Sequence, residues 1–470
     1  MTTETSKRAF LNGAAGALAL LLPAAAAATD NLEGVDEFVR AEMARQQIPG
    51  VAVGIVRQGT VIKAQGYGLA NVEHQVPVRP ETIFQSGSLG KQFTAAAVMS
   101  LVEEAKVALD DPISKYLPDA PAAFRPITVR HLLTHTSGIP DYTDGTFDLR
   151  RDLTEDDLAR MAFGLTLEFA PGTRWNYSNT GYVLLGIIVR KASGRFYGDV
   201  LRDRVFTPLG MKTTRVISEE DIVPNRAAGY RLVKGELKNQ EWVAPSLNTT
   251  ADGALYFSVL DLIAWDRGLR TRAVLTPASW AAVFAPVRLG SGKTFPYGFG
   301  WSVEQFAGQT VHGHGGSWQG FKTHLTRYLG DDLTIIVMAN LAQASPERIA
   351  DGIAGVLNPK LARPEPTAIA DTEPRVTARL KDLLAAARDG RLSREQFAYV
   401  RAGFFPDAAR DYAETLHGLG EPTRVTLLER RDLGDDRVYR YEVAYGDRTF
   451  RVGLGVAPDE KLSAFDVRPK

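Results

Sequence analysis

Apolar residues recur with two different periods along this chain, and the change of period marks out its elements. Residues 31–47 follow a helical period, and so does the run from Lys91 to Lys106. Between them, residues 50–56 and 60–69 are rich in β-branched and apolar residues, with Gln58-Gly59 separating the two runs. This pattern predicts a helix, a β-hairpin that turns at Gln58-Gly59, and a second helix. The apolar face of that second helix comprises Phe93, Ala97, Val98, Leu101, Val102 and Ala105.

The middle and later parts of the chain differ in period. Residues 111–250 are predicted to be helical, with loops rich in proline and glycine. Strand-like runs return at residues 299–303, 310–312, 321–328 and 333–338, and a last helix is expected at 345–357. We therefore predict an α/β (α+β) fold in which an antiparallel sheet is flanked by helices and carries an inserted helical lobe.

A proline-rich stretch precedes the last hundred residues. Pro364, Pro366 and Pro374 predict a linker over residues 363–374, which would separate a main domain at 29–362 from a module at 375–470. In this module we expect a helix at 375–388, two more helices within 393–418, and three or four strands. Apolar residues alternate with polar ones around Gly446-Asp447, which predicts strands with one buried face. We expect this small α+β module to have a structural or substrate-gating role.

The N-terminus has the pattern of an export signal. Lys7 and Arg8 precede an apolar run at residues 14–22, and residues 24–28 are small enough for cleavage. Residues 6–11 resemble a twin-arginine signal with lysine in the first basic position. We expect residues 1–28 to be a signal peptide and the mature protein to start near Thr29 or Asp30. The protein would then be periplasmic or secreted, with no stable membrane insertion after cleavage.

Composition excludes several classes of function. Fifty-five basic residues balance fifty-five acidic ones, and no basic stripe suggests a nucleic-acid partner. The chain has no cysteine, which excludes disulfides, a thiol nucleophile and a lipid anchor on cysteine. Its seven histidines form no H-E-x-x-H motif, so we predict no metal and no other cofactor. His131 and His135 lie four residues apart, and we interpret both as structural.

The sequence Ser88-Leu89-Gly90-Lys91 has the spacing of a nucleophile and its base. It is the only S-x-x-K in the chain, and it stands where a helix is predicted to start. A three-residue offset on a helix places Ser88 and Lys91 on one face. Serine needs an adjacent base to be a nucleophile, and lysine can be that base when burial lowers its pKa. The backbone N–H of Ser88 could also stabilise an oxyanion.

Two further motifs support this chemistry. Tyr177 and Asn179 form the only Y-x-N, in which tyrosine can transfer a proton and asparagine can bind a substrate amide. The second motif runs from His312 to Phe321 and is rich in glycine, which lets a substrate lie close to an edge strand. The N–H of Ser317, within this motif, could complete the oxyanion hole with that of Ser88.

In this order and at these separations, the three motifs resemble those of the serine β-lactamase and D-alanyl-D-alanine peptidase superfamily. The branch that they resemble most is the class C type, which includes D-aminopeptidases and β-lactamase-like esterases. The resemblance covers about residues 31–360. It extends to segments at residues 131–140, 171–173, 251–255 and 297–301. It implies an active site between the helical lobe and the sheet.

The third motif departs from the K-T-G of true β-lactamases, because His314-Gly315-Gly316 stands there. A lysine would be a permanent cation for a substrate carboxylate, whereas histidine is mostly neutral at pH 7. The resemblance implies that His314, Gly315 and Gly316 contact the substrate and that β-lactam turnover is slow. From an unperturbed pKa of about 6.5, we expect binding of carboxylate-bearing substrates to improve below neutrality.

Together these observations predict a serine hydrolase that acts through an acyl-enzyme on amide, peptide or ester bonds. Ser88 would be the nucleophile, and Lys91 and Tyr177 would share the proton, with the identity of the acylation base left open. D-amino-acid peptides, β-lactam-like compounds and short esters are the candidate substrates. A carboxylesterase is one alternative, and a non-catalytic sensor of cell-wall fragments is another. The intact trio of Ser88, Lys91 and Tyr177 argues against the sensor.

Overall fold

The computed structural model describes residues 30–143, 147–400 and 404–470. The predicted signal peptide at residues 1–28 lies outside the described residues and stays a prediction. Within the described ranges, no helix is both long enough and apolar enough to cross a bilayer.

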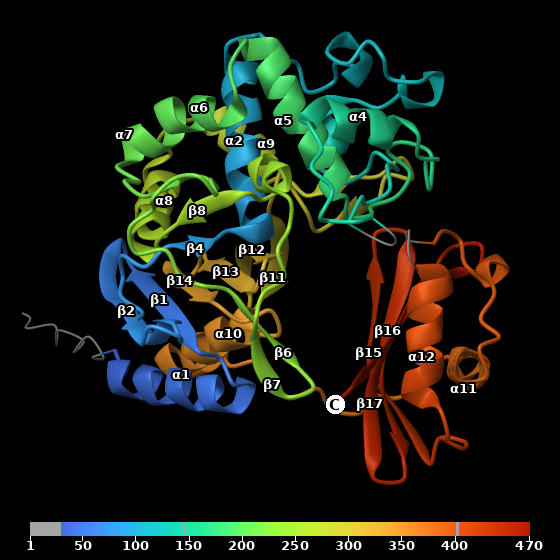
Figure 1. Ribbon diagram of the computed structural model, residues 1–470. Coiled ribbons are helices and arrows are strands. Elements are labelled where there is room, and N and C mark those ends of the chain that lie inside the picture. The colour runs from blue at the N-terminus through green and yellow to red at the C-terminus, as the bar shows by residue number, and fades with distance from the viewer. Residues whose placement is uncertain (1–29, 144–146, 401–403) are drawn as a thin grey trace, which may run out of the picture.

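The main domain is built on one antiparallel sheet of seven strands, in the order β11-β12-β13-β14-β1-β2-β3 (Figure 1). Its interior strand β1 has the unbroken apolar sequence of a strand that is covered on both faces. The predicted hairpin is confirmed, because β1 pairs with β2 and the chain turns between Arg57 and Thr60. The strand bounds are β1 Gly50–Arg57, β2 Thr60–Asn71, β3 Val76–Pro77, β11 Ser302–Phe306, β12 Gln309–Trp318, β13 Phe321–Tyr328 and β14 Leu333–Ala339.

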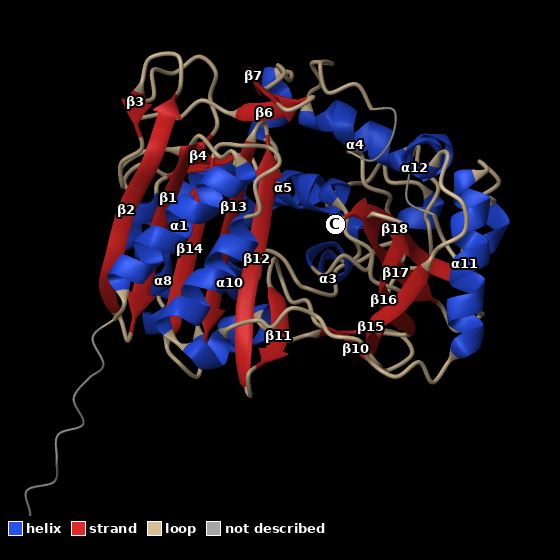
Figure 2. Ribbon diagram, turned by 90° about the horizontal axis from the view of Figure 1, so that it is seen from below, coloured by secondary structure: helices blue, strands red, loops and turns tan. Residues whose placement is uncertain are grey.

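Helices cover both faces of this sheet (Figure 2). Helices α1 (Leu32–Gln46) and α10 (Pro346–Leu357) pack on one face, where they share a core with Val51, Val53 and Ile55. Helix α8 (Val259–Thr271) packs on the other face, so closely that a side chain at Gly54 would meet Val259. The predicted antiparallel sheet flanked by helices is confirmed.

Helix α2 (Lys91–Glu103) lies between the sheet and the helical lobe. The sequence predicts one apolar face, but residues 91–101 are all buried, because the lobe covers the side that the sheet does not. The lobe also contains short strands that the sequence analysis missed. Apart from α2 and α8, the helices and strands between β3 and β11 are α3 Val129–Leu133, α4 Glu155–Phe163, α5 Asn179–Ser193, α6 Tyr197–Leu201, α7 Thr207–Leu209, α9 Pro277–Val283, β4 Phe84–Gln85, β5 Arg215–Val216, β6 Tyr230–Val233, β7 Glu236–Asn239, β8 Leu255–Phe257, β9 Val287–Arg288 and β10 Thr294–Phe295.

The C-terminal module has four antiparallel strands in sequence order, β15 (Arg424–Leu433), β16 (Asp436–Tyr445), β17 (Arg448–Val456) and β18 (Leu462–Pro469). Helix α11 (Pro374–Arg388) and helix α12 (Ala409–Leu416) pack on one face and close a separate hydrophobic core (Figure 1). In the described part of residues 393–418, α12 is the one α-helix, where two were expected. The exact domain boundaries stay a prediction.

The module is attached to the main domain by specific contacts. Arg174 and Asp436 form an ion pair of 3.1 Å, and both side chains are largely buried. The Arg174 guanidinium also lies 5.3 Å from the ring centroid of Tyr399, whose ring packs edge-on against Phe169. Strands of the module line one cavity together with residues 314–317 of β12.

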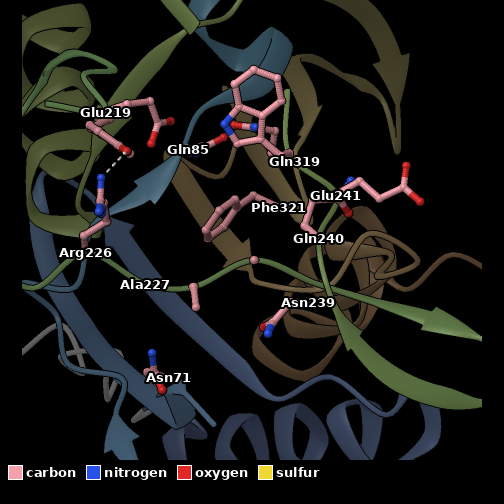
Figure 3. Close-up of a pocket in the computed structure, with 14 residues that line it drawn as sticks. Asn71, Gln85, Glu219, Arg226, Ala227, Asn239, Gln240, Glu241, Gln319 and Phe321 are labelled. Atoms are coloured by element: carbon pink, nitrogen blue, oxygen red, sulfur yellow. Dashed lines mark hydrogen bonds between the residues drawn. The ribbon is translucent and has the colours of Figure 1, made fainter. Parts of the chain in front are cut away.

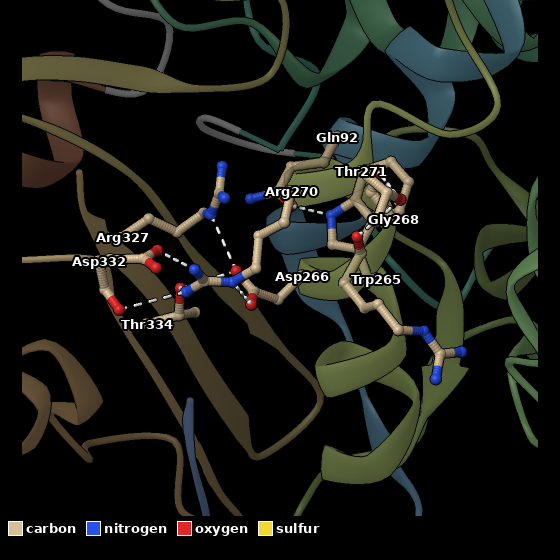
Figure 4. Close-up of polar contacts among 10 residues, drawn as sticks. Gln92, Trp265, Asp266, Gly268, Arg270, Thr271, Arg327, Asp332 and Thr334 are labelled. Carbon is tan, nitrogen blue, oxygen red and sulfur yellow. Dashed lines mark hydrogen bonds and ion pairs between the residues drawn. The ribbon is translucent and has the colours of Figure 1, made fainter. Parts of the chain in front are cut away.

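A buried carboxylate ties α8 to the sheet (Figure 4). Asp266 is fully buried, and its two oxygens accept hydrogen bonds from Arg327 on β13 at 3.0 Å, Thr334 on β14 at 2.7 Å and Arg270 at 2.5 Å. Removing one partner of a buried ion pair leaves a charge without compensation.

We expect Asp266→Ala to lower the free energy of unfolding by about 3–5 kcal/mol, because it leaves the buried Arg327 guanidinium without its carboxylate partner, whereas Arg270 keeps Asp332. Chemical denaturation would measure this loss. Asp203→Ala is the control, because Asp203 pairs with Arg195 and Arg202 at the surface and such pairs contribute about 0–1 kcal/mol. Equal effects of the two substitutions would contradict a structural role for the buried network.

Candidate active site

Ser88 and Lys91 meet at the start of α2. Ser88 lies in a 3₁₀ turn, η1 (Gly87–Gly90), that leads directly into the helix, and Lys91 Nζ lies 3.2 Å from Ser88 Oγ. Gly87 has a φ of 50°, and a Cβ there would lie 2.2 Å from the backbone nitrogen of Ser317. Glycine is therefore required for η1 to approach β12 this closely.

The Lys91 ammonium is enclosed by acceptors and aromatic rings. Its Nζ donates to Asn179 Oδ1 at 2.6 Å and to the Asp252 carbonyl, and it lies 4.9 Å from the Tyr177 ring centroid. Lys91 is fully buried, and this burial lowers its pKa from 10.5 to about 8, against the opposing charges of Asp252 and Asp141. Such a lysine can lose its proton near neutral pH, as the sequence predicts.

Tyr177 and Asn179 reach the same point from the start of α5. Burial raises the pKa of Tyr177 well above 10, and the neighbouring Ser88 hydroxyl offsets only part of this rise. The buried Tyr177 hydroxyl makes no standard hydrogen bond within the described ranges. Asn179 Nδ2 donates to Asp141 at 2.9 Å and to Thr143 at 3.3 Å. Both ends of this carboxamide are therefore engaged, and its predicted substrate contact stays a prediction.

His314 is joined to His135 through Tyr297. The backbone N–H of Ser178 donates to His135 Nδ1 at 3.1 Å, which leaves the proton of the neutral ring on Nε2. That Nε2 lies 3.2 Å from Tyr297 Oη, which in turn lies 2.8 Å from His314 Nε2. His314 Nδ1 lies 2.6 Å from the Gly315 carbonyl. When both histidines are neutral, each hydrogen bond from His135 through Tyr297 to His314 has one donor and one acceptor.

The expected charging of His314 near pH 6.5 is wrong for this structure. Burial lowers the pKa of His314 to about 3, despite the hydrogen bond to the Gly315 carbonyl, and nearby Lys91 lowers it further. His314 therefore stays neutral across the range in which most enzymes work. Carboxylate binding cannot improve below neutrality through this ring.

The glycine-rich motif forms an open edge of the sheet. Strand β11 pairs with β12 only as far as Gly313, whereas β13 continues beside β12 to Trp318. A strand was expected only at residues 310–312, but all of residues 312–318 belong to β12. A Cβ on Gly316 would lie 2.0 Å from the Ser86 carbonyl, so this edge packs against the turn that carries Ser88. The N–H groups of Ser88 and Ser317 are thus brought to one site, and their oxyanion role stays a prediction.

Comparison with known proteins identifies the family. The model of the family described as Beta-lactamase matches residues 35–357. The chain belongs to the Beta-lactamase family. The predicted membership of the serine β-lactamase and D-alanyl-D-alanine peptidase superfamily is confirmed, and with it the serine hydrolase class.

Two proteins of known name are similar in sequence to this β-lactamase family member. It is 33% identical over 307 residues to penicillin-binding protein 4* of Bacillus subtilis, an alignment that covers 60% of this chain and 68% of the relative. It is 29% identical over 357 residues to a D-aminopeptidase of Gluconobacter oxydans, with 72% of this chain and 65% of the relative covered.

Solved structures confirm the fold. An octameric penicillin-binding protein homologue from Pyrococcus abyssi aligns with a TM-score of 0.63 at 24% identity, covering 94% of this chain and 100% of that one. A D-amino acid amidase from Ochrobactrum anthropi SV3 aligns with a TM-score of 0.60 at 24% identity, covering 70% and 97%.

In this β-lactamase-like site, Ser88 and Ser317 stand between two cavities of different size. The smaller cavity has a volume of about 100 Å³ and is lined by Tyr142, Asn179 and Asp252, among others. The larger one has a volume of about 1590 Å³ and is lined by Tyr177, by residues 314–316 and by the C-terminal module. A substrate that lies across Ser88 therefore has a confined side and a spacious side.

A third cavity lies apart from this chemistry (Figure 3). It has a volume of about 410 Å³, its lining includes Asn71, Gln85, Arg226 and the exposed Trp242, and it shares no lining residue with the two cavities at Ser88. Among the residues that the structure describes, no group of three or more histidine, aspartate or glutamate side chains could hold a metal ion.

Several residues around the site had no role assigned from the sequence. Asp252 and Tyr297 lie in segments that carry the family resemblance, and the structure places them beside Lys91 and between the two histidines. His135 was interpreted as structural, and here its ring is held between the Ser178 N–H and the Tyr297 hydroxyl. His131 caps α3, where its Nδ1 accepts the Thr128 N–H at 3.2 Å.

We expect Tyr297→Phe to lower the free energy of unfolding by about 1–3 kcal/mol, because it leaves two buried imidazole nitrogens without a partner. Thermal or chemical denaturation would measure the loss, and nitrogen NMR would show altered tautomers of both rings. Tyr197→Phe is the matched control, since that buried hydroxyl has one partner, the Thr250 carbonyl at 2.9 Å. Unchanged histidine spectra in Tyr297→Phe would contradict the hydrogen-bond chain.

Proposed function

We propose that this protein is an aminopeptidase or amidase that removes a small N-terminal residue from a larger peptide or amide. The coarser activity, serine hydrolysis of amide bonds, follows from the family and its relatives. A preference for the D configuration is suggested by the names of the D-aminopeptidase and the D-amino acid amidase. The finer assignment is supported by one observation, the unequal size of the two cavities beside Ser88.

The direction of the substrate follows from where the leaving group must receive its proton. Expulsion of an amine requires a proton donor on the leaving-group side of the serine. Tyr177 lines the large cavity and not the small one. The leaving group therefore belongs in the large cavity, and the acyl group in the small one. This orientation favours release of one small residue from a bulky amine.

The volume of the small cavity limits the size of the acyl residue that can bind there. An engineered cavity of ~150 Å³ binds benzene in a protein interior, and this one is smaller, with about 100 Å³. It suits an alanine-sized residue with a free amino group and is too small for an aromatic or N-acylated residue.

The proposed reaction has two halves. Lys91, in its neutral form, accepts the proton of Ser88 as Ser88 Oγ attacks the amide carbon, and the N–H groups of Ser88 and Ser317 bind the oxyanion. The C–N bond breaks as Tyr177 gives its proton to the leaving nitrogen and takes the serine proton back from Lys91, which becomes neutral again. Water then attacks the acyl-enzyme and gives a proton to Lys91, which returns it to Ser88 Oγ as the free residue leaves. Asn179 holds Lys91 in place throughout.

A panel of 4-nitroanilides of D-alanine, L-alanine, D-phenylalanine and N-acetyl-D-alanine tests this proposal. We expect D-alanine to be released with a kcat/KM at least tenfold above those of the other three. Ser88→Ala should reduce the rate by at least about a thousandfold, as loss of a nucleophile does. Faster removal of a single residue from N-acyl-D-alanyl-D-alanine would favour a carboxypeptidase instead. Turnover of short esters alone would favour the carboxylesterase.

The pH profile tests the role of Lys91. Because the base must be uncharged, kcat/KM should rise with pH through about 8, the lowered pKa of Lys91. His314, with its pKa near 3, should add no step between pH 5 and 7. An uncharged ester such as 4-nitrophenyl acetate is the right substrate, since a free α-amino group titrates near 7.7–8.0. A step near pH 6.5 would place a histidine in the proton path and contradict this assignment.

A further inference from the structure

The large cavity contains one lysine that has no partner. Besides Lys322, six basic residues line this cavity, and each forms an ion pair with a carboxylate: Arg348, Arg363, Arg440, Arg451, Arg468 and Lys470. Lys322 is partly buried, and among the described residues no carboxylate or hydrogen-bond acceptor pairs with it. Burying a charge without a partner costs free energy, so an anion bound beside Lys322 would stabilise its charged form.

The fold places Lys322 next to the open edge of β12. On β13 it stands opposite Ser317, and its other neighbour across the sheet is Ala339, which belongs to the core beneath α1 and α10. Directly opposite residues of antiparallel strands project on the same face. Beyond Gly313, where β11 no longer pairs with β12, this face of the edge strand carries only Gly315 and Ser317. Small side chains therefore stand beside Lys322 where it lines the cavity that Ser88 also lines.

We propose that Lys322 binds a carboxylate on the leaving-group side of the substrate, so that the preferred substrates are peptides with a free C-terminal carboxylate. This inference rests on the proposed function, because it assumes that the leaving group occupies the large cavity. True β-lactamases have a lysine cation in the third motif, whereas this chain has His314 there, which stays neutral. In this chain the positive charge comes from the next strand instead.

The C-terminal module strengthens this preference. Strands β15 to β18 form the far wall of the cavity, and the arginines that they contribute are already neutralised by their own carboxylates. They enclose the space without offering a free cation. Because Lys322 is itself partly buried, its attraction to a carboxylate is stronger than it would be on an open surface.

Peptides of graded length test the proposal, because the structure does not fix how many substrate residues span the distance from Ser88 to Lys322. D-alanyl-glycine, D-alanyl-diglycine and D-alanyl-triglycine are compared with their C-terminal amides. For the best length, the wild type should prefer the acid, and Lys322→Met should lower the acid-to-amide ratio of kcat/KM at least tenfold, mainly through KM. Lys322→Arg should retain most of the preference. Lys322→Gln serves if the methionine variant does not fold.

Arg468→Met is the matched control, because it removes a cavity cation that already pairs with Asp466 at 2.8 Å. It should change the ratio less than twofold. A ratio within twofold of wild type in Lys322→Met, no wild-type preference for the acid, or an equal loss in Arg468→Met would each overturn the proposal.

Failure of the proposed function can be told apart from failure of this inference. If the wild type cleaves none of these peptides, the aminopeptidase assignment fails. The Kd of the acid peptides is then measured by calorimetry on Ser88→Ala with and without Lys322→Met. At least tenfold weaker binding in the double variant supports the carboxylate site, and equal binding overturns it.

Discussion

The site depends on the burial of one ammonium group. Lys91 lies at the start of a helix that is enclosed by the sheet on one side and by the lobe on the other. Its contacts with Asn179 and the Asp252 carbonyl hold the charged form, while desolvation favours the neutral form. The balance brings the pKa close to working pH, where a base is most effective. A helix exposed on one face could not have lowered it in this way.

A second constraint is the close approach of β12 to the turn that carries Ser88. This approach requires glycine at positions 87 and 316, since a side chain at either position would overlap backbone atoms of the other segment. The edge of β12 is open from His314 onward, because β11 ends its pairing at Gly313. The packing contact thus brings the nucleophile and the candidate oxyanion donors to the edge that β11 leaves open.

Sequence reasoning succeeds where spacing along the chain is enough. The S-x-x-K offset, the hairpin of β1 and β2, and strand β13 at residues 321–328 all depend on local periodicity. It fails where distant segments meet. His135, Tyr297 and His314 are joined across more than 160 residues, and neither the hydrogen-bond chain nor the lowered pKa of His314 has a local signal. The burial of α2 on all sides was likewise hidden, because it depends on where the lobe folds back.

The two histidines and Lys322 illustrate how charge is distributed around a buried site. Adding a second cation at position 314 would raise the cost of charging Lys91, since like charges in a dry site repel. A neutral imidazole, fixed by Tyr297, fills that position and contacts the Gly315 carbonyl instead. Lys322 starts from the face of β13 that it shares with Ala339, beneath α1 and α10, whereas Lys91 belongs to α2, which packs against the lobe. The proposed carboxylate site at Lys322 would thus place a cation for an anionic substrate away from the base that starts the reaction.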